Sequence, residues 1–213
     1  MPAYRSSAEA DIREPVVARL RALIPGCRII HEINAASFGN RIDVLAVGDD
    51  TLAAVEIKSA KDKIDRLPAQ IAAMANVSNL VFAALHEKFL HQMHGGYYTP
   101  NEANGATVWV WPVIERKGHI NCGIEWADRD KWKKPMQCLP VGALGMLWRE
   151  EVQQVCRGFG IKAAGQLTME HARDHIMWRM TGAEITRMIC ATLRQRECVE
   201  GDPATTPPAS PTT

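Results

Sequence analysis

The sequence lacks the features that mark several large classes of protein. No window reaches the ~18 apolar residues that a membrane span needs, and the first residues, MPAYRSSAEADIREP, contain no uninterrupted apolar segment like that of a secretory signal peptide. The six cysteines are scattered without a C-x-x-C pair, which argues against a disulfide framework or a zinc knuckle. We therefore expect a soluble, cytoplasmic protein with reduced cysteines and no membrane partner.

An excess of charge of one sign is also missing. Lys and Arg total 25 against 24 Asp and Glu, so overall charge does not indicate a nucleic-acid partner, and any anion-binding surface must be local. The densest basic segment is RDKWKK, residues 129–134. Its Lys131, Trp132, Lys133 and Lys134 are of the types that neutralise phosphates and stack on unpaired bases. A solvated loop is the alternative for this segment.

What the sequence does contain is enough apolar residues for a sizeable core: 46% of 213 residues. The apolar spacing predicts a helix from about Asp11 to Ile24, with Asp11 and Glu14 as its capping box. Three β-like runs follow, CRIIHEI, RIDVLAV and TLAAVEIK, separated by turn residues. A second helix is predicted from about Asp65, and the apolar run NLVFAAL is typical of a buried strand.

The rest of the chain changes from strands to helices. HEKFLHQM is predicted to start a helix, and TVWVWPVIE and HINCGIEW are predicted to be strands, the first ended by Pro112. Three segments beyond Pro140 have helical periodicity, two of them opened by threonine N-caps, Thr168 and Thr181. We therefore predict an α/β core with a central mixed sheet flanked by helices over residues 1–140, a helical region over 141–199 and a disordered tail over 200–213.

Three charged residues stand in or at the end of the predicted strands. Asp43 interrupts an apolar run, and Glu56 and Lys58 project from one face of the next strand, roughly 7 Å apart. If the two strands form a hairpin through GDD, all three side chains converge. Adjacent carboxylates repel each other, and a divalent cation relieves that repulsion. Mg²⁺ is the expected cation, because it needs only one or two carboxylates and completes its shell with water and phosphate oxygens.

The same residues carry a resemblance to a known superfamily. An aspartate followed by E-x-K on the next strand resembles the PD-(D/E)XK, or restriction-endonuclease-like, nucleases. The run EIKSAKDKIDRLPAQI resembles a small bacterial and phage branch in which E-I-K-S is followed by R-L-P-x-Q and a helix. The chain departs from the superfamily pattern in one place, because Arg41 and Ile42 stand where a proline often precedes the aspartate. The resemblance covers about residues 10–90 well.

This resemblance implies a Mg²⁺-dependent deoxyribonuclease with a restriction-endonuclease-like fold, in which Mn²⁺ can substitute. It implies that Asp43 and Glu56 bind the metal together with the backbone carbonyl of Ile57. Lys58 would orient or deprotonate the attacking water and stabilise the developing charge. Glu32 resembles an additional acidic ligand of the metal or its water.

The helix after the motif supplies two further candidates. Gln70 resembles the glutamine that reaches the active site in RecB-like nucleases, and Arg66, one turn earlier, is a candidate for contact with DNA. The implied partner is therefore DNA. Its strandedness, the mode of cleavage and the oligomeric state stay open, with a homodimer as one option.

Simpler interpretations accompany each of these assignments. A strand-terminal Glu and Lys are commonly a solvated pair, and Glu32 can equally lie on an exposed strand face. His86, His91 and His94 suggest zinc, but no accompanying ligand has finger-like spacing, so a half-exposed helix is favoured. The rival functions are a nucleic-acid-binding protein that keeps the nuclease fold without useful turnover, and a structural protein with an incidental acidic site.

Overall fold

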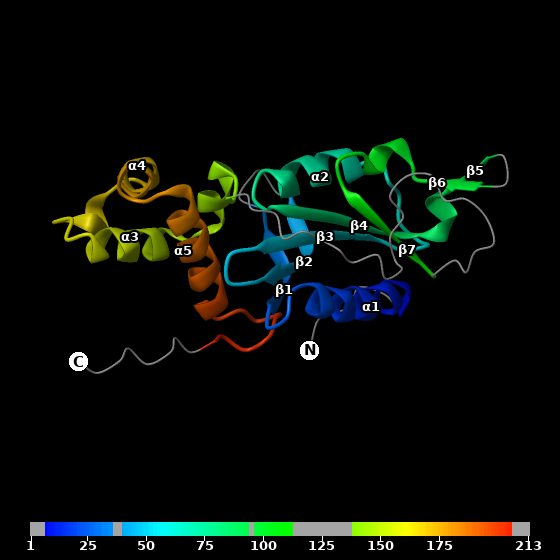
Figure 1. Cartoon of the computed structure of the whole chain (residues 1–213), viewed down its shortest axis with the longest axis horizontal. Helices are drawn as coiled ribbons and strands as arrows, with labels where there is room; N and C mark the ends of the chain where they lie inside the picture. Colours follow the sequence, from blue (N-terminus) through cyan, green and yellow to red (C-terminus); the bar gives the residue numbers. More distant parts are fainter. Residues whose placement is uncertain (1–6, 36–39, 94–95, 113–137, 206–213) are drawn as a thin grey trace.

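A five-stranded mixed sheet forms the centre of the molecule (Figure 1). The computed structural model describes residues 7–35, 40–93, 96–112 and 138–205. The sheet has the order β1-β2-β3-β4-β7, and its first three strands pair in antiparallel fashion while β3, β4 and β7 run parallel. The strands are β1 (Arg28–Asn34), β2 (Arg41–Val47), β3 (Leu52–Lys58), β4 (Leu80–His86) and β7 (Thr107–Trp111).

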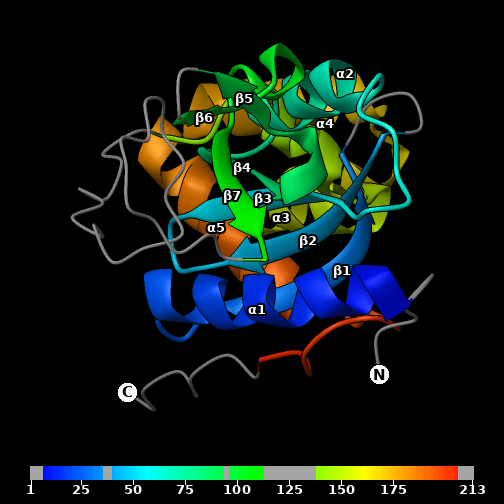
Figure 2. The ribbon, with the colours of Figure 1, turned by 90° about the vertical axis from the view of Figure 1, so that its right-hand side faces the viewer.

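Helices cover both faces of this sheet. The helix α1 (Ser7–Leu23) lies along one face and α2 (Leu67–Ala75) along the other, as Figure 2 shows. Every residue of β3 is buried, because apolar side chains of a strand covered on both faces pack in both directions. Val55 packs in the cluster beside α1, whereas Ala54 packs in the cluster beside α2. The prediction of an α/β fold with a mixed sheet flanked by helices is confirmed.

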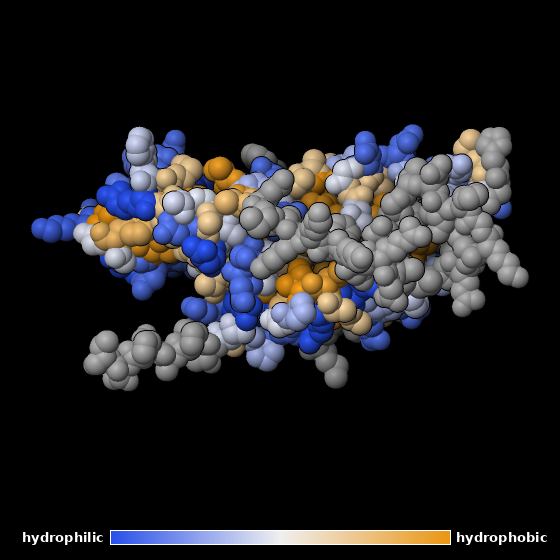
Figure 3. Space-filling model, viewed as in Figure 1, coloured by the Kyte–Doolittle hydropathy of each residue, from blue (hydrophilic) through white to orange (hydrophobic). Residues whose placement is uncertain are grey.

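The C-terminal part is helical and lies beyond one end of the sheet (Figure 1). It contains η3 (Val141–Met146), α3 (Arg149–Gly158), η4 (Ala164–Gln166), α4 (Met169–Arg179) and α5 (Gly182–Gln195). The predicted N-caps are confirmed, since the hydroxyl of Thr168 accepts from His171 N and that of Thr181 from Glu184 N. Figure 3 shows polar and apolar side chains side by side over the C-terminal helices.

Two predicted helix positions are wrong. The first helix begins at Ser7, so Asp11 lies inside it and cannot cap it, and Pro15 is an interior residue. The buried contacts of Ile12 and Val16 with the sheet hold this helix despite the proline. HEKFLHQM forms the short η1 (Glu87–Phe89) and then β5 (His91–Met93), which pairs with β6 (Gly96–Tyr98). All three residues of β5 are exposed, and only Phe89 and Leu90 of this segment pack against the core.

The predicted start of the disordered tail is also wrong. Residues 200–205 are described, and Gly201 forms a bridge to Ile30 at the edge of β1. Asp202 anchors this segment, because its carboxylate accepts from Ile29 N at 2.9 Å and its backbone N donates to Ile29 O at 2.8 Å. An edge strand offers unpaired backbone groups, and the tail satisfies them. The predicted strand HINCGIEW lies outside the described residues.

Within the part of the chain that the structure describes, no helix combines the length and apolar content that crossing a membrane requires. The five described cysteines are free, as predicted.

Candidate active site

The candidate site lies at the end of the β2–β3 hairpin. The ladder between the two strands reaches the pair Val44 and Val55, so its next step would place Asp43 opposite Glu56. At that point a side-chain hydrogen bond follows the backbone ladder, because Asp43 Oδ2 accepts from Ile57 N at 2.8 Å. The hairpin thus brings both carboxylates to one place, as the sequence predicted.

Glu56 is the most deeply buried acid of the site, with 2% of its surface exposed. Its Oε1 accepts hydrogen bonds from Lys58 Nζ at 2.7 Å and from the amide of Gln70. Its Oε2 is buried and has no hydrogen-bond partner among the described residues. Burial, followed by the charge of Asp43, raises the pKa of Glu56 to about 7, against the opposing effects of Lys58 and Gln70.

Asp43 has a similar electrostatic environment. Burial raises the pKa of its carboxyl above the ordinary value, although the hydrogen bond from Ile57 and the charges of Arg13 and Lys58 oppose this shift. Arg13 itself is buried, and its guanidinium donates to the backbone carbonyl of Asp43 at 2.7 Å. Ionisation of both acids at once is therefore unfavourable, and a bound cation would offset the repulsion between the two carboxylates.

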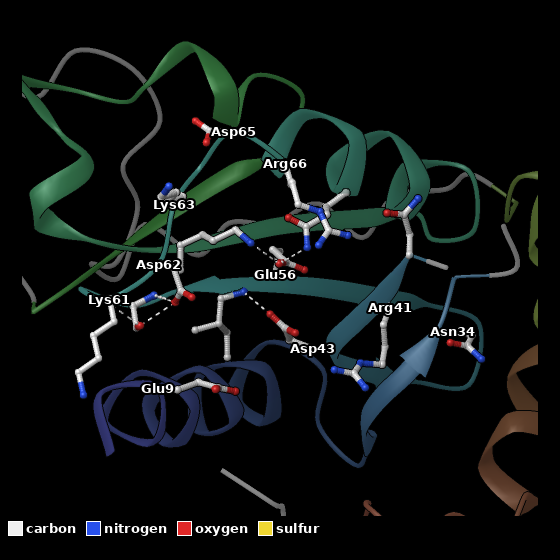
Figure 4. Close-up of a pocket in the computed structure, with 15 residues that line it drawn as sticks. Glu9, Asn34, Arg41, Asp43, Glu56, Lys61, Asp62, Lys63, Asp65 and Arg66 are labelled. Atoms are coloured by element: carbon white, nitrogen blue, oxygen red, sulfur yellow. Dashed lines mark hydrogen bonds and ion pairs between the residues drawn. The ribbon is translucent and has the colours of Figure 1, made fainter. Parts of the chain in front are cut away.

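Asp43, Glu56 and Lys58 form the floor of a pocket of about 700 Å³ (Figure 4). Exposed basic side chains stand at its rim, namely those of Lys61, Lys63 and Arg66. The other lining residues are Glu9, Asn34, Asn40, Arg41, Asp43, Glu56, Ile57, Lys58, Ser59, Asp62, Asp65 and Gln70.

The loop between β3 and α2, which carries the basic rim, is held by specific contacts. Asp62 Oδ2 accepts from Ser59 N at 2.7 Å and from Ser59 Oγ at 2.6 Å. Lys88, which follows β4, donates to the backbone carbonyls of Ala60 and Asp62, the latter at 2.9 Å. The rim residues are thus presented by an anchored loop.

Six of the residues predicted from the sequence meet in this pocket: Asp43, Glu56, Ile57, Lys58, Arg66 and Gln70. Gln70 reaches it from the first turns of α2, which begins at Leu67 after Arg66 and contains Pro68 in its first turn. The predicted DNA contacts Lys131, Trp132, Lys133 and Lys134 lie outside the described residues.

Glu32 is not brought into the pocket. It has a left-handed backbone with φ of 56°, and its carboxylate forms ion pairs with Arg13 at 2.8 Å and Arg41 at 2.6 Å. The structure therefore places Glu32 among arginines beside the site, and it is absent from the residues that line the pocket. The prediction of a ligand role for Glu32 is not supported by this position, which favours a structural one.

Three acidic residues that line the pocket were not predicted as site residues: Glu9, Asp62 and Asp65. Glu9 of α1 forms an ion pair at 2.5 Å with Arg13, one helical turn later. The i, i+4 spacing of Glu9 and Arg13 is a recognisable signal, but the predicted helix began only at Asp11. The earlier start of α1 is what brings Glu9 to the site.

The donor atoms fit a hard divalent cation better than zinc. Asp43, Glu56 and the nearby backbone of Ile57 offer oxygen ligands, and the buried Glu56 Oε2 has no other described partner. Among the described residues, no group of three or more His, Cys, Asp or Glu side chains is arranged to hold a metal. Two carboxylates suffice for Mg²⁺, which keeps water or phosphate in its remaining positions.

A comparison with protein families finds one similarity. The family described as bacteriophage P4 protein cII matches residues 3–100. This range is less than half of the chain, but it contains α1, the strands β1 to β4, and every residue that lines the pocket. Comparisons with curated proteins and with solved structures find no match. The similarity thus covers the candidate site and stops before the C-terminal helices.

Proposed function

We propose that this protein is a metal-dependent nuclease of the PD-(D/E)XK type that hydrolyses phosphodiester bonds in DNA. The observation that carries the proposal is the buried Glu56 beside Lys58 and the half-buried Asp43, with one carboxylate oxygen of Glu56 lacking a described partner. Placing a second acid beside a buried one is costly unless a ligand compensates for their repulsion. A catalytic cation would provide that compensation.

The side chains of the pocket then have distinct roles. Asp43 and Glu56 would hold the cation, which when bound supplies Lewis-acid stabilisation of negative charge on the phosphate. Lys58 Nζ, fixed by its bond to Glu56, is available to orient the attacking water and to stabilise the developing charge. Gln70 fixes the Glu56 carboxylate through the same oxygen.

Substrate binding belongs to the rim of the pocket. The exposed Lys61, Lys63 and Arg66 stand around an opening whose floor is acidic. Such residues bind phosphates without reading the base sequence. The similarity to a phage protein family agrees with a role in phage biology.

A cleavage assay tests the proposal. Purified protein is incubated with single-stranded, duplex and branched DNA and with RNA, in Mg²⁺, Mn²⁺, Ca²⁺ or EDTA. We expect cleavage of at least one DNA substrate with Mg²⁺ or Mn²⁺ and none with EDTA. Asp43→Asn should abolish cleavage, because it removes one of two charges that hold the cation.

The matched control is Asp49→Asn, in the turn at the other end of the same hairpin, where Asp49 is 91% exposed. This variant should cleave like the wild type. Cleavage that persists in EDTA or in Asp43→Asn would contradict the proposal. DNA binding without cleavage under any of these conditions would instead favour the rival function, a nuclease-fold protein that only binds nucleic acid.

A further inference from the structure

A second cavity adjoins the candidate active site. Its volume is about 590 Å³, and it shares Asn34 and Arg41 with the first pocket. Figure 4 shows Arg41 and Asn34 at the opposite end of the first pocket from Lys61. The second cavity continues from there, between β1, the start of α3 and the segment after α5. The two cavities are therefore neighbours that meet at Asn34 and Arg41.

An aromatic ring is held at the wall of this second cavity. Trp148, directly before α3, keeps 56% of its surface exposed. The guanidinium of Arg196 stacks over its ring at 4.4 Å from the centroid. Arg196 is itself fixed, because it donates to Glu151 Oε1 at 2.7 Å and to Met146 O at 2.9 Å. A large aromatic surface is thus immobilised from one side and open to solvent, as a stacking platform requires.

Glu200 lines the same cavity. The backbone oxygen of Glu200 accepts from His31 N at 2.9 Å, which fixes this residue against β1. Its side-chain Oε2 is buried and has no hydrogen-bond partner among the described residues. A buried acceptor of this kind is costly to leave unpaired, and amino or imino N–H groups of a ligand would satisfy it.

The charges of the cavity exclude a phosphate site. Its two arginines are engaged by acids, Arg41 by Glu32 at 2.6 Å and Arg196 by Glu151 at 2.5 Å. Glu197 and Glu200 add negative charge to the lining. The cavity therefore suits a flat, neutral group with hydrogen-bond donors on its edge better than an anion.

We propose that the second cavity binds an unpaired base of the DNA strand whose backbone occupies the candidate active site. The base stacks on Trp148 and donates to Glu200, while the sugar-phosphate backbone stays in the candidate active site. This inference rests on the proposed function, because the position of the second cavity beside the candidate active site is what selects a nucleic-acid base over other flat groups. It makes single-stranded or locally unpaired DNA the preferred substrate, since a paired base cannot enter.

Equilibrium binding with a matched pair of tryptophan variants tests this assignment. Fluorescein-labelled single-stranded and blunt duplex DNA are titrated in Ca²⁺ with wild type, Trp148→Ala and Trp178→Ala. Trp178 lies on α4, is 87% exposed and lines neither cavity. Trp148→Ala should weaken binding of the single strand by about tenfold, the loss of one base stack. Its duplex affinity, and both affinities of Trp178→Ala, should stay at the wild-type values.

A wild-type experiment covers the case in which Trp148→Ala does not fold. Single-stranded DNA containing 5-iododeoxyuridine is photocrosslinked to the protein, and we expect the crosslinked peptide to contain Trp148. Three results would overturn the assignment and leave the nuclease proposal intact. Folded Trp148→Ala could bind single-stranded DNA as tightly as the wild type, or it could lose as much affinity for duplex as for single-stranded DNA. The crosslinks could also lie only outside this cavity. If the wild type cleaves no substrate but Trp148→Ala binds single-stranded DNA more weakly than the wild type does, only the nuclease proposal is refuted.

Discussion

At the scale of single residues, the decisive feature is the environment of Glu56. Burial and the charge of Asp43 raise its pKa to about 7, from an ordinary value of 4.5. The folded protein therefore binds this proton more tightly than the unfolded chain does. The resulting stabilisation is complete below the unfolded pKa and is lost as pH rises through the folded pKa. Without a cation, the site destabilises the protein at neutral and alkaline pH.

The upward shift in the pKa of Glu56 leads to a prediction for the pH dependence of stability. In EDTA, the free energy of unfolding should fall between pH 5 and pH 8, by a contribution from Glu56 on the order of 3 kcal/mol. Glu56→Gln should flatten this fall and be the more stable protein at pH 8. Glu150→Gln, which removes an exposed carboxylate from α3, is the control and should follow the wild type. Urea titrations across this pH range measure the effect, and identical profiles for wild type and Glu56→Gln would refute it.

A second prediction at this scale separates catalysis from binding. Lys58 is proposed to act mainly in the transition state, so Lys58→Ala should lower the single-turnover rate at saturating DNA by orders of magnitude with little change in affinity. Lys61→Ala removes an exposed lysine from the rim of the same pocket. It should weaken binding, reduce its salt dependence by nearly one unit and keep the saturated rate. The opposite pattern for Lys58→Ala would make that lysine a phosphate-binding group.

The residues of the site were predictable to different degrees. Asp43 and Glu56 could be placed together from the sequence because strand alternation and a short turn fix which residues of a hairpin meet. Glu32 could not be placed, because its left-handed backbone and its ion pairs with Arg13 and Arg41 depend on contacts between distant segments. No local pattern encodes such contacts.

At the scale of elements, the β2–β3 hairpin and α2 build the floor of the site, and the loop between β3 and α2 builds its rim. The apolar runs of the sequence predicted the hairpin, and the R-L-P motif with the apolar spacing after it predicted α2. The short segments η1, β5 and β6 were not predicted, because HEKFLHQM has helical composition, whereas in the structure only Phe89 and Leu90 pack against the core and all of β5 is exposed. The start of α1 was missed because Asp11 resembles an N-cap, whereas the helix begins one turn earlier at Ser7, where Glu9 pairs with Arg13.

The anchoring of the rim loop can be tested through Lys88. Lys88→Met removes the donor to the carbonyls of Ala60 and Asp62, so backbone amides of residues 59–66 should exchange hydrogen faster. Lys162→Met, an exposed lysine between α3 and α4, is the control and should leave that exchange unchanged. Because the loop carries the phosphate contacts, Lys88→Met should also raise KM more than it lowers kcat. Unchanged exchange over residues 59–66 would show that Lys88 does not anchor the loop.

At the scale of the whole molecule, the sheet and the C-terminal helices are joined through buried arginines and the segment after α5. Arg28 of β1 donates to Leu193 O at 2.7 Å and to Asp202 O at 3.0 Å. The division into an α/β part and a helical part followed from the change in periodicity along the sequence. The attachment of residues 200–205 did not, because a polar, proline-containing segment has no apolar pattern and is held here by backbone and Asp202 hydrogen bonds.

Two truncations test this attachment. A chain ending at Thr205 keeps every described contact of the tail, whereas one ending at Val199 loses the bonds of Asp202 with Ile29, Arg28 and Arg21. The shorter chain should be less stable by about 1–3 kcal/mol, because buried groups of β1 lose their partners. Urea unfolding measures the difference. Equal stability of the two truncated chains would mean that the segment contributes nothing to the fold.

The central claim is that Asp43 and Glu56 together form the binding site of a catalytic divalent cation. Calorimetric titration of Mn²⁺ into the protein at pH 8, which lies above the raised pKa of Glu56, tests it most directly. We predict a single class of binding in the wild type and in Asp49→Asn. The same binding should be lost in Asp43→Asn and in Glu56→Gln. Undiminished Mn²⁺ binding by the last two variants, or none by the wild type, would contradict the account.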